Sequence, residues 1–141
     1  MIEIAYFNIQ KYPVTELFVK KIVRKAAGFE KKLTGTVEIS LVDNRRIRAL
    51  NKVWRGQDKA TDVLSFAWRE ESKIKSPLIG QIFVSYPKIV SQAADYKVAV
   101  EKELSRMIVH GLLHLCGHEH AEAGRAKKMF ALQEKIIDKI A

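Results

Sequence analysis

All four histidines of the chain lie within residues 110–120, and this concentration indicates metal chemistry. They are His110, His114, His118 and His120, and three of them follow the spacing H-x3-H-x5-H. On an α-helix, four residues turn about 40° beyond one full turn, so the imidazoles of His110 and His114 share one face. Zinc takes histidine nitrogen at roughly 2.0–2.1 Å, and catalytic zinc sites commonly combine three protein ligands with one open position. The spacing therefore predicts a metal site built from one helix and the chain that follows it.

Gly117 lies between the second and third ligands of this pattern. Glycine often ends a helix in the left-handed conformation, so we expect a turn at Gly117 that directs His120 back toward the ion. His118 would lie in the turn itself and is expected near the site rather than among the ligands. The alternative interpretation is a helix that carries core or surface histidines by chance, which this spacing disfavours.

The same relative positions of three histidines and a glycine occur in the metzincin protease pattern H-E-x-x-H-x-x-G-x-x-H. In those proteases the glutamate serves as the general base, whereas this chain has Gly111 at that position. The sequence therefore predicts the metal ligands without the base for peptide hydrolysis. A zinc metallopeptidase remains an alternative function, favoured by the histidine spacing and opposed by Gly111.

The chain has 141 residues and an excess of positive charge. It has 25 Lys and Arg against 16 Asp and Glu, a formal net charge of +9, which favours RNA or DNA as a partner through phosphate contacts. No apolar run has the length of a membrane span, and no secretory signal is visible. The single cysteine, Cys116, suits a reducing compartment and is expected to be a buried packing residue.

Hydrophobic periodicity predicts the elements that must position the histidines. A single α+β domain is expected over residues 1–141, with a small mixed sheet of about four strands packed with helices. The helix that carries His110 and His114 is apolar almost all round from Met107 onward, so it should be buried. Asp43 should cap a short helix, and Pro87 should open another. We expect strands over 1–9, 36–42, 63–68 and 81–86, helices over 14–27, 43–54, 98–116 and 121–140, and a solvated charged stretch over 69–75.

Two motifs resemble those of the YbeY family of metal-dependent endoribonucleases. One is the histidine run HGLLHLCGHEH of residues 110–120. The other, LNKVWRGQDKATDVLSF over residues 50–66, is similar to the family pattern N-x-x-[YW]-R-x-x-D-x-x-T-D-V-L-S-F. There are three departures: Gln81 stands where the family usually has an acidic residue, Glu119 where it often has aspartate, and Ala60 where proline is common.

The resemblance implies a cytoplasmic rRNA maturation factor. Such a protein would be a single-strand-specific endoribonuclease that acts at the 3′ end of small-subunit ribosomal RNA and in ribosome quality control. The implied cofactor is one Zn²⁺ ion held by His110, His114 and His120, although such ligands also accept other divalent transition metals. The implied partners are ribosomal RNA, the small ribosomal subunit and ribosome-associated proteins, with no membrane. A further alternative is a non-catalytic ribosome-assembly module whose metal is structural.

These residues lead to a hypothesis of metal-assisted cleavage of an RNA phosphodiester, with Arg55 and His114 as the catalytic residues. The resemblance makes Arg55 the family's functional arginine, and a guanidinium can clamp a phosphate through two hydrogen bonds. The alternative for Arg55 is a surface ion pair with Asp58 or Asp62. The nucleophile would be either water activated by the metal or the adjacent 2′-hydroxyl, and no general base is evident.

Arg55 and Lys59 are the expected substrate-binding residues. Basic groups beside an aromatic ring can track a phosphate backbone and stack a base. Trp54 is nevertheless expected to anchor the core rather than to stack a base. The basic stretch around it comprises Arg45, Arg46, Arg48, Lys52, Arg55 and Lys59.

Three further charged residues are expected close to the site. Glu103 precedes His110 by seven residues, about 20° away around a helix, so it either supports the site or pairs with a neighbouring lysine. Arg106 is a basic candidate near the cleft. Asp62 is expected to hold the loop that presents Arg55.

Overall fold

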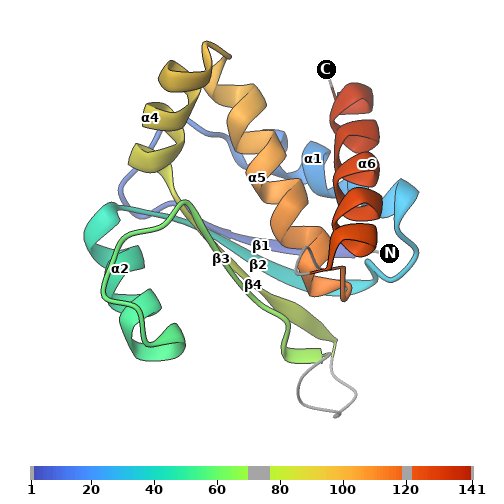
Figure 1. Ribbon diagram of the computed structural model, residues 1–141, viewed down its shortest axis with the longest axis horizontal. Helices are drawn as coiled ribbons and strands as arrows, with labels where there is room; N and C mark the ends of the chain where they lie inside the picture. The colour runs from blue at the N-terminus through green and yellow to red at the C-terminus, as the bar shows by residue number, and fades with distance from the viewer. Residues whose placement is uncertain (1, 70–76, 119–121, 141) are drawn as a thin grey trace.

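The computed structural model describes residues 2–69, 77–118 and 122–140, which form a four-stranded sheet with helices on both faces (Figure 1). The expected α+β class and small mixed sheet are confirmed. The elements follow along the chain as β1 (Ile2–Phe7), α1 (Glu16–Phe29), β2 (Gly35–Val42), α2 (Asn44–Arg55), β3 (Val63–Phe66), β4 (Leu78–Ser85), α4 (Tyr86–Tyr96), α5 (Val100–Leu115) and α6 (Ala123–Ile140).

The strands lie in the order β1-β2-β4-β3, so β3 forms one edge of the sheet. Strands β1, β2 and β4 run parallel, whereas β3 runs antiparallel to β4. The β3–β4 ladder ends where Phe66 pairs with Gln81, which is why β3 stops before the predicted end at residue 68. On its outer side, β3 therefore has backbone N–H and C=O groups that can bond to residues beyond the sheet edge.

Alternate residues of the sheet enter two separate cores, as the pleat of a strand requires. Ile82 and Val84 of β4 belong to the larger core, which includes the buried side chains of α1 and α5. Leu64 and Phe66 of β3 pack with Ile47 of α2 in the smaller one. Figure 1 shows α1, α5 and α6 on one side of the sheet and α2 on the other.

Local capping chemistry sets several of the helix ends. The Asp43 side chain accepts a hydrogen bond from the Arg46 backbone N–H at 2.8 Å, which confirms the predicted cap of α2. Gly56 ends α2 in the left-handed conformation at φ 69°. Pro87 lies in the first turn of α4, as predicted. Within the described residues, none of the helices is both long and apolar enough for a membrane span.

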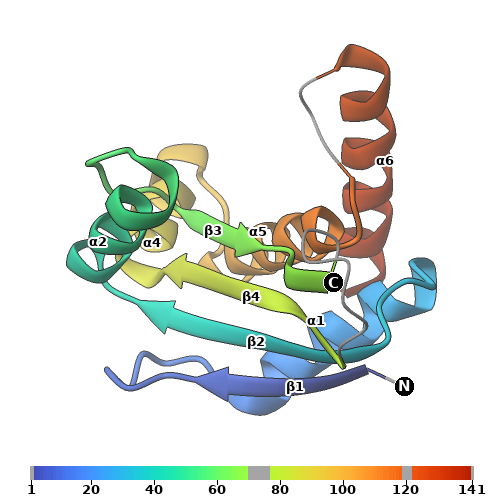
Figure 2. The same cartoon turned by 90° about the horizontal axis from the view of Figure 1, so that it is seen from below.

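Two glycines allow α5 to lie close against the sheet. A Cβ atom at Gly111 would lie 3.0 Å from the Ser65 hydroxyl oxygen and 3.1 Å from side-chain carbons of Ile82. A Cβ atom at Gly80 would clash with the Phe66 carbonyl oxygen and lie 2.7 Å from a Leu115 methyl carbon. The histidine-bearing face of α5 is thereby brought next to the edge strand β3. Figure 2 shows α6 standing across the end of α5, against which it packs.

Candidate metal centre and adjoining cavity

The side chains of His110 and His114 lie on one face of α5, and their Nε2 atoms point toward each other. Their Nε2 atoms are 3.1 Å apart, and the ring centroids are 4.6 Å apart at an interplanar angle of 78°. Two imidazole nitrogens at this distance share either a proton or a cation. The helical spacing has therefore produced the convergence that the sequence predicts for these two residues.

Gln133 of α6 fixes the tautomer of His110. Its Oε1 atom lies 2.8 Å from His110 Nδ1, and an amide oxygen only accepts hydrogen bonds, so Nδ1 carries the proton. The Nε2 atom of His110 then keeps its lone pair for the position shared with His114. Metal-binding histidines generally donate their other N–H to such an acceptor. Gln133 was missed from the sequence, although a polar residue between Met129 and Ile136 on the buried face of a helix was the available signal.

The pair fits two positions in a zinc coordination sphere. Two nitrogens at roughly 2.0–2.1 Å from one tetrahedral ion lie about 3.3 Å apart, close to the 3.1 Å between these atoms. The third predicted ligand, His120, lies outside the described residues, as does Glu119. Within the part of the chain that the structure describes, no group of three or more His, Cys, Asp or Glu residues could hold an ion. His120 as a ligand therefore stays a prediction.

The turn after α5 has the predicted conformation. Gly117 has a φ of 88°, in the left-handed region, and its N–H donates to the His114 carbonyl oxygen at 3.0 Å. Cys116 is buried, as expected. His118 Nε2 lies 2.7 Å from Glu30 Oε2. Partial burial opposes a low pKa at Glu30, but hydrogen bonds from His118 and the Lys32 backbone outweigh it, so the pKa is lowered.

Arg55 shares a cavity of about 430 Å³ with the histidine pair. The side chain leaves the last turn of α2 and reaches the edge of β3, where Nη2 donates to the Ser65 carbonyl oxygen at 2.8 Å. The guanidinium carbon lies 4.9 Å from the centre of the Phe66 ring, a cation–π contact. The cavity is lined by Arg55, Asp62, Val63, Leu64, Ser65, Ala67, His110 and His114.

The acidic residues that competed for Arg55 in the sequence have other partners. Asp58 binds Arg48 at 2.8 Å, and this hydrogen bond lowers the pKa of the Asp58 carboxyl. Asp62 accepts hydrogen bonds from the Val63 backbone N–H at 2.8 Å and from the Gln92 amide at 3.1 Å. Asp62 thus ties the start of β3 to α4. The guanidinium has five N–H donors, of which the bond to Ser65 uses one, so Arg55 retains donors for a phosphate.

Lys59, the other predicted substrate-binding residue, and Trp54, the expected core anchor, are both placed differently from the prediction. Lys59 is exposed and does not line the histidine cavity; its carbonyl oxygen accepts from the buried Asn51 amide at 3.0 Å. Trp54 is 56% exposed, so the expectation that it anchors the core is wrong. Phe66 and Trp68 belong to the smaller core and stack on each other, and Trp54 meets both rings only through edge-type contacts.

Arg106 and Glu103 bind each other rather than the histidines. Arg106 Nη1 lies 3.3 Å from Glu103 Oε1, and its Nε lies 3.0 Å from Glu134 Oε1. The hydrogen bond from Arg106 lowers the pKa of Glu134, with a smaller contribution from Gln133. The partner of Glu103 is thus an arginine, not the lysine considered from the sequence. It is Gln133, and not Glu103, that contacts His110 Nδ1.

Gln81, the non-acidic departure from the family motif, belongs to the opposite face of the sheet. Its side chain accepts a hydrogen bond from the Trp68 ring N–H at 2.8 Å and donates to Glu38 at 2.7 Å. Its neighbour Ile82 is the residue that faces Gly111 of α5. The side chain at position 81 therefore has its hydrogen-bond partners, Trp68 and Glu38, on the face away from the histidine pair.

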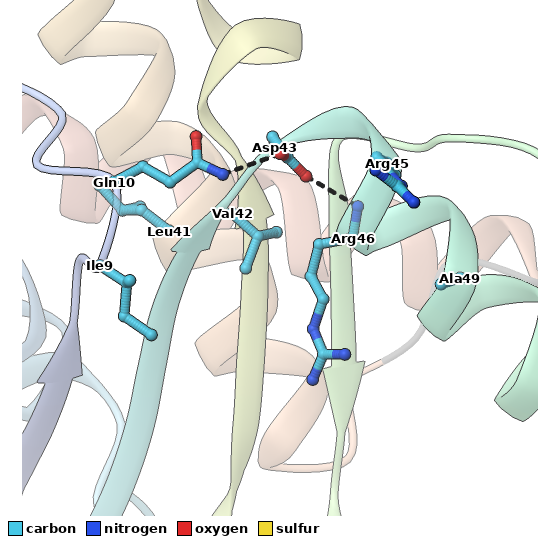
Figure 3. A pocket seen from close by; sticks show the side chains of 8 residues that line it. All are labelled: Ile9, Gln10, Leu41, Val42, Asp43, Arg45, Arg46 and Ala49. Carbon is cyan, nitrogen blue, oxygen red and sulfur yellow. Dashed lines mark hydrogen bonds between the residues drawn. The ribbon is translucent and has the colours of Figure 1, made fainter.

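A second cavity of about 430 Å³ lies where β2 leads into α2 (Figure 3). Asp43 occupies its rim, bonded to the Gln10 amide and the Arg46 backbone. Its other lining residues are the apolar Ile9, Leu41, Val42 and Ala49 and the basic Arg45. Without histidine or cysteine in its lining, this cavity offers little to a transition metal, so the cavity beside His110 is the candidate site.

The fold and the site define a class of α+β protein with two histidines on a buried helix. An arginine from a helix on the other face of the sheet reaches them past the edge strand. The sequence profile described as endoribonuclease YbeY matches residues 5–141. Endoribonuclease YbeY of Malacoplasma penetrans is 36% identical over 139 residues, covering 93% of each chain. Its counterpart in Sulfurihydrogenibium is 41% identical over 128 residues, covering 90% of this chain and 84% of the other.

A solved structure agrees with these sequence relationships. The solution structure of TM1509 from Thermotoga maritima superposes with a TM-score of 0.68 at 29% identity, covering 98% of this chain and 89% of that one. The chain therefore belongs to the YbeY endoribonuclease family, as the two sequence motifs predict.

Proposed function

We propose that this chain is an endoribonuclease that cleaves RNA with the aid of one divalent metal ion. Family membership supports RNA cleavage as the reaction. The observation that carries the metal dependence is the convergence of the His110 and His114 Nε2 atoms, 3.1 Å apart, in the cavity that also contains Arg55. The formal charge of +9 favours a polyanionic substrate.

His110, His114 and His120 would hold the ion, which we propose to be Zn²⁺. Three neutral imidazoles leave its charge intact, and such an ion acts as a Lewis acid and lowers the pKa of a bound water. Gln133 holds the His110 ring in the tautomer whose Nε2 is free of a proton. This assignment makes His110 and His114 ligands, and Gln133 a positioning residue.

Arg55 is proposed to bind the scissile phosphate. Its guanidinium stays charged at any working pH and can donate two parallel hydrogen bonds to phosphate oxygens. The bond to the Ser65 carbonyl and the contact with the Phe66 ring hold it at the edge of the cavity. Asp62 supports this arrangement by fixing the start of β3 through its bonds to Val63 and Gln92.

The structure disfavours both alternative functions. A metallopeptidase would need a glutamate at position 111, but Gly111 is buried with Ser65 and Ile82 within about 3 Å of where its Cβ would lie. A carboxylate there would have no room and would be directed into the sheet. A purely structural metal site is normally closed by four protein ligands, whereas an open cavity of about 430 Å³ adjoins this pair.

We further propose that the substrate is single-stranded ribosomal RNA near the 3′ end of the small-subunit molecule. The support is the resemblance of residues 50–66 and 110–120 to the family motifs, together with the basic stretch along α2 and the loop after it. The corresponding role is rRNA maturation and ribosome quality control in the cytoplasm, with ribosome-associated proteins as partners.

The test is cleavage of an end-labelled RNA that contains the mature 3′ end and its precursor extension. The purified protein should cleave it with Zn²⁺ and lose activity with a chelator, and metal analysis should find about one ion per chain. His114→Ala and Arg55→Ala should each abolish cleavage, while Arg24→Ala, an exposed arginine on α1, serves as the matched control. Activity of Arg55→Ala equal to the wild type would remove the arginine from the mechanism. A 2′,3′-cyclic phosphate on the product would exclude attack by water.

A further inference from the structure

We propose that Trp54 is a base-stacking subsite for the single-stranded RNA whose phosphate binds at Arg55. This inference rests on the proposed function, because it assigns the path by which the substrate leaves the histidine cavity. Trp54 is 56% exposed at the end of α2, next to the exposed Val53. A large aromatic ring so exposed to water contributes little to the core and is available to a ligand.

The contacts of Trp54 leave ring surface open for stacking. It meets Phe66 and Trp68 in edge-type arrangements, with centroids 6.1 Å apart in each case and interplanar angles of 67° and 75°. Phe66 and Trp68 stack on each other instead, at 5.6 Å and 10°. The pair thus supports Trp54 without sandwiching it. The ring is held by contacts with Phe66 of β3 and with Trp68, which stacks on Phe66.

Trp54 is also close enough to Arg55 to act on the same strand of RNA. The Arg55 guanidinium carbon lies 4.9 Å from the centre of the Phe66 ring, and the Trp54 ring centre lies 6.1 Å from it. The guanidinium and the indole are therefore at most about 11 Å apart. A phosphate on Arg55 and a base on Trp54 can thus belong to neighbouring nucleotides.

The distribution of charge favours the Trp54 side of the histidine cavity as the path of the RNA. Beyond His110 lies a second cavity of about 300 Å³ with exposed aromatic residues, Tyr96 and Phe130, in its lining. Asp62 lines both cavities, but on that side Glu103 adds a further carboxylate and Arg106 is already bound by Glu103 and Glu134, so positive charge is not in excess there.

Around Trp54 the exposed charged residues are mainly basic. Arg48, Lys52 and Lys59 lie near it in the sequence, and although Asp58 pairs with Arg48 at 2.8 Å, this one carboxylate leaves an excess of two positive charges. Positive charge beside an open aromatic ring is the combination that binds single-stranded nucleic acid without sequence preference.

The experiment uses the full-length, metal-loaded protein and a short uridine-rich RNA with 2′-O-methyl groups, which is not cleaved through its 2′-hydroxyl. Trp54→Leu should weaken binding about 5- to 150-fold, the range that a lost base–aromatic stack produces. Trp54→Phe should bind within about threefold of the wild type. Tyr96→Leu is the matched control, because this exposed aromatic lines the cavity beyond His110 and should leave the affinity unchanged.

Intrinsic fluorescence provides a second readout, since the chain has only two tryptophans, Trp54 and Trp68. RNA should quench the wild-type emission, and Trp54→Phe should lose most of this quenching while it still binds. Unchanged affinity of folded Trp54→Leu, in a wild-type background that binds and cleaves RNA, would overturn the stacking subsite and leave the proposed function intact. Loss of affinity in Tyr96→Leu instead would move the RNA path to the cavity beyond His110. If the wild-type protein neither binds nor cleaves RNA, both proposals fall.

Discussion

Replacing Gln133 with leucine should weaken zinc binding without changing any ligand. Gln133 is 3% exposed, and its Oε1 accepts the proton of His110 Nδ1 at 2.8 Å. Leucine has a similar volume and no acceptor, so the His110 ring loses its orientation and its Nε2 becomes less basic. Loss of such an outer partner typically costs 10–100-fold in metal affinity, which corresponds to about 1.4–2.7 kcal/mol. Titration of zinc against a competing fluorescent chelator at pH 7 measures this change.

A second measurement on the same variant does not involve the metal. Without metal, Gln133→Leu leaves the partly buried Nδ1–H of His110 without its acceptor, which should lower the free energy of unfolding by about 1–3 kcal/mol. Gln133→Glu keeps an acceptor at this position and should retain zinc affinity within about threefold. If Gln133→Leu binds zinc as tightly as the wild type with an intact fold, the assignment of the His110 tautomer is refuted.

Three more outcomes are expected. Arg55→Lys keeps the charge but loses the planar fork and the contact with Phe66, so RNA cleavage should fall at least about tenfold, and an unchanged rate would contradict phosphate clamping. Gly111→Glu buries a carboxylate against the sheet and should lower the free energy of unfolding in urea by about 3 kcal/mol or more. Asp43→Ala removes the cap of α2 and should cost about 1 kcal/mol at pH 7. Hydrogen bonds from the Arg46 backbone and a side-chain amide lower the pKa of Asp43. The contribution of the Asp43 carboxylate to stability should therefore be complete above about pH 4 and disappear as the pH falls through the lowered pKa. A cost of Asp43→Ala that stays constant on acidification would contradict this role of the carboxylate.

Local chemistry made several features of this protein predictable from its sequence. The spacing of His110 and His114 places both rings on one helix face, wherever that helix packs. Asp43 accepts the Arg46 N–H as its residue type predicts, and Gly117 adopts a positive φ. Alternation and helical periodicity likewise predicted most elements to within a few residues. All these features depend on contacts between residues that are close in the chain.

The order of the strands and the composition of the cavity depend on contacts between distant segments. Gln133 meets His110 only because α6 crosses the end of α5, and periodicity identifies a buried helix face without naming its partner. Arg55 reaches the cavity only because β3 is the edge strand, so that the Ser65 carbonyl oxygen is available to it.

Trp54 is the clearest case of a side chain whose position could not be predicted from its neighbours in the sequence. Its sequence neighbourhood predicted a core anchor, yet Trp54 is mostly exposed, and it is Phe66 and Trp68 from another part of the chain that join the smaller core. The sequence by itself determined which side chains carry the chemistry and which helix turns present them. Only the tertiary structure decided which of them meet, because close packing in a folded chain depends on the shapes and volumes of all the neighbours at once.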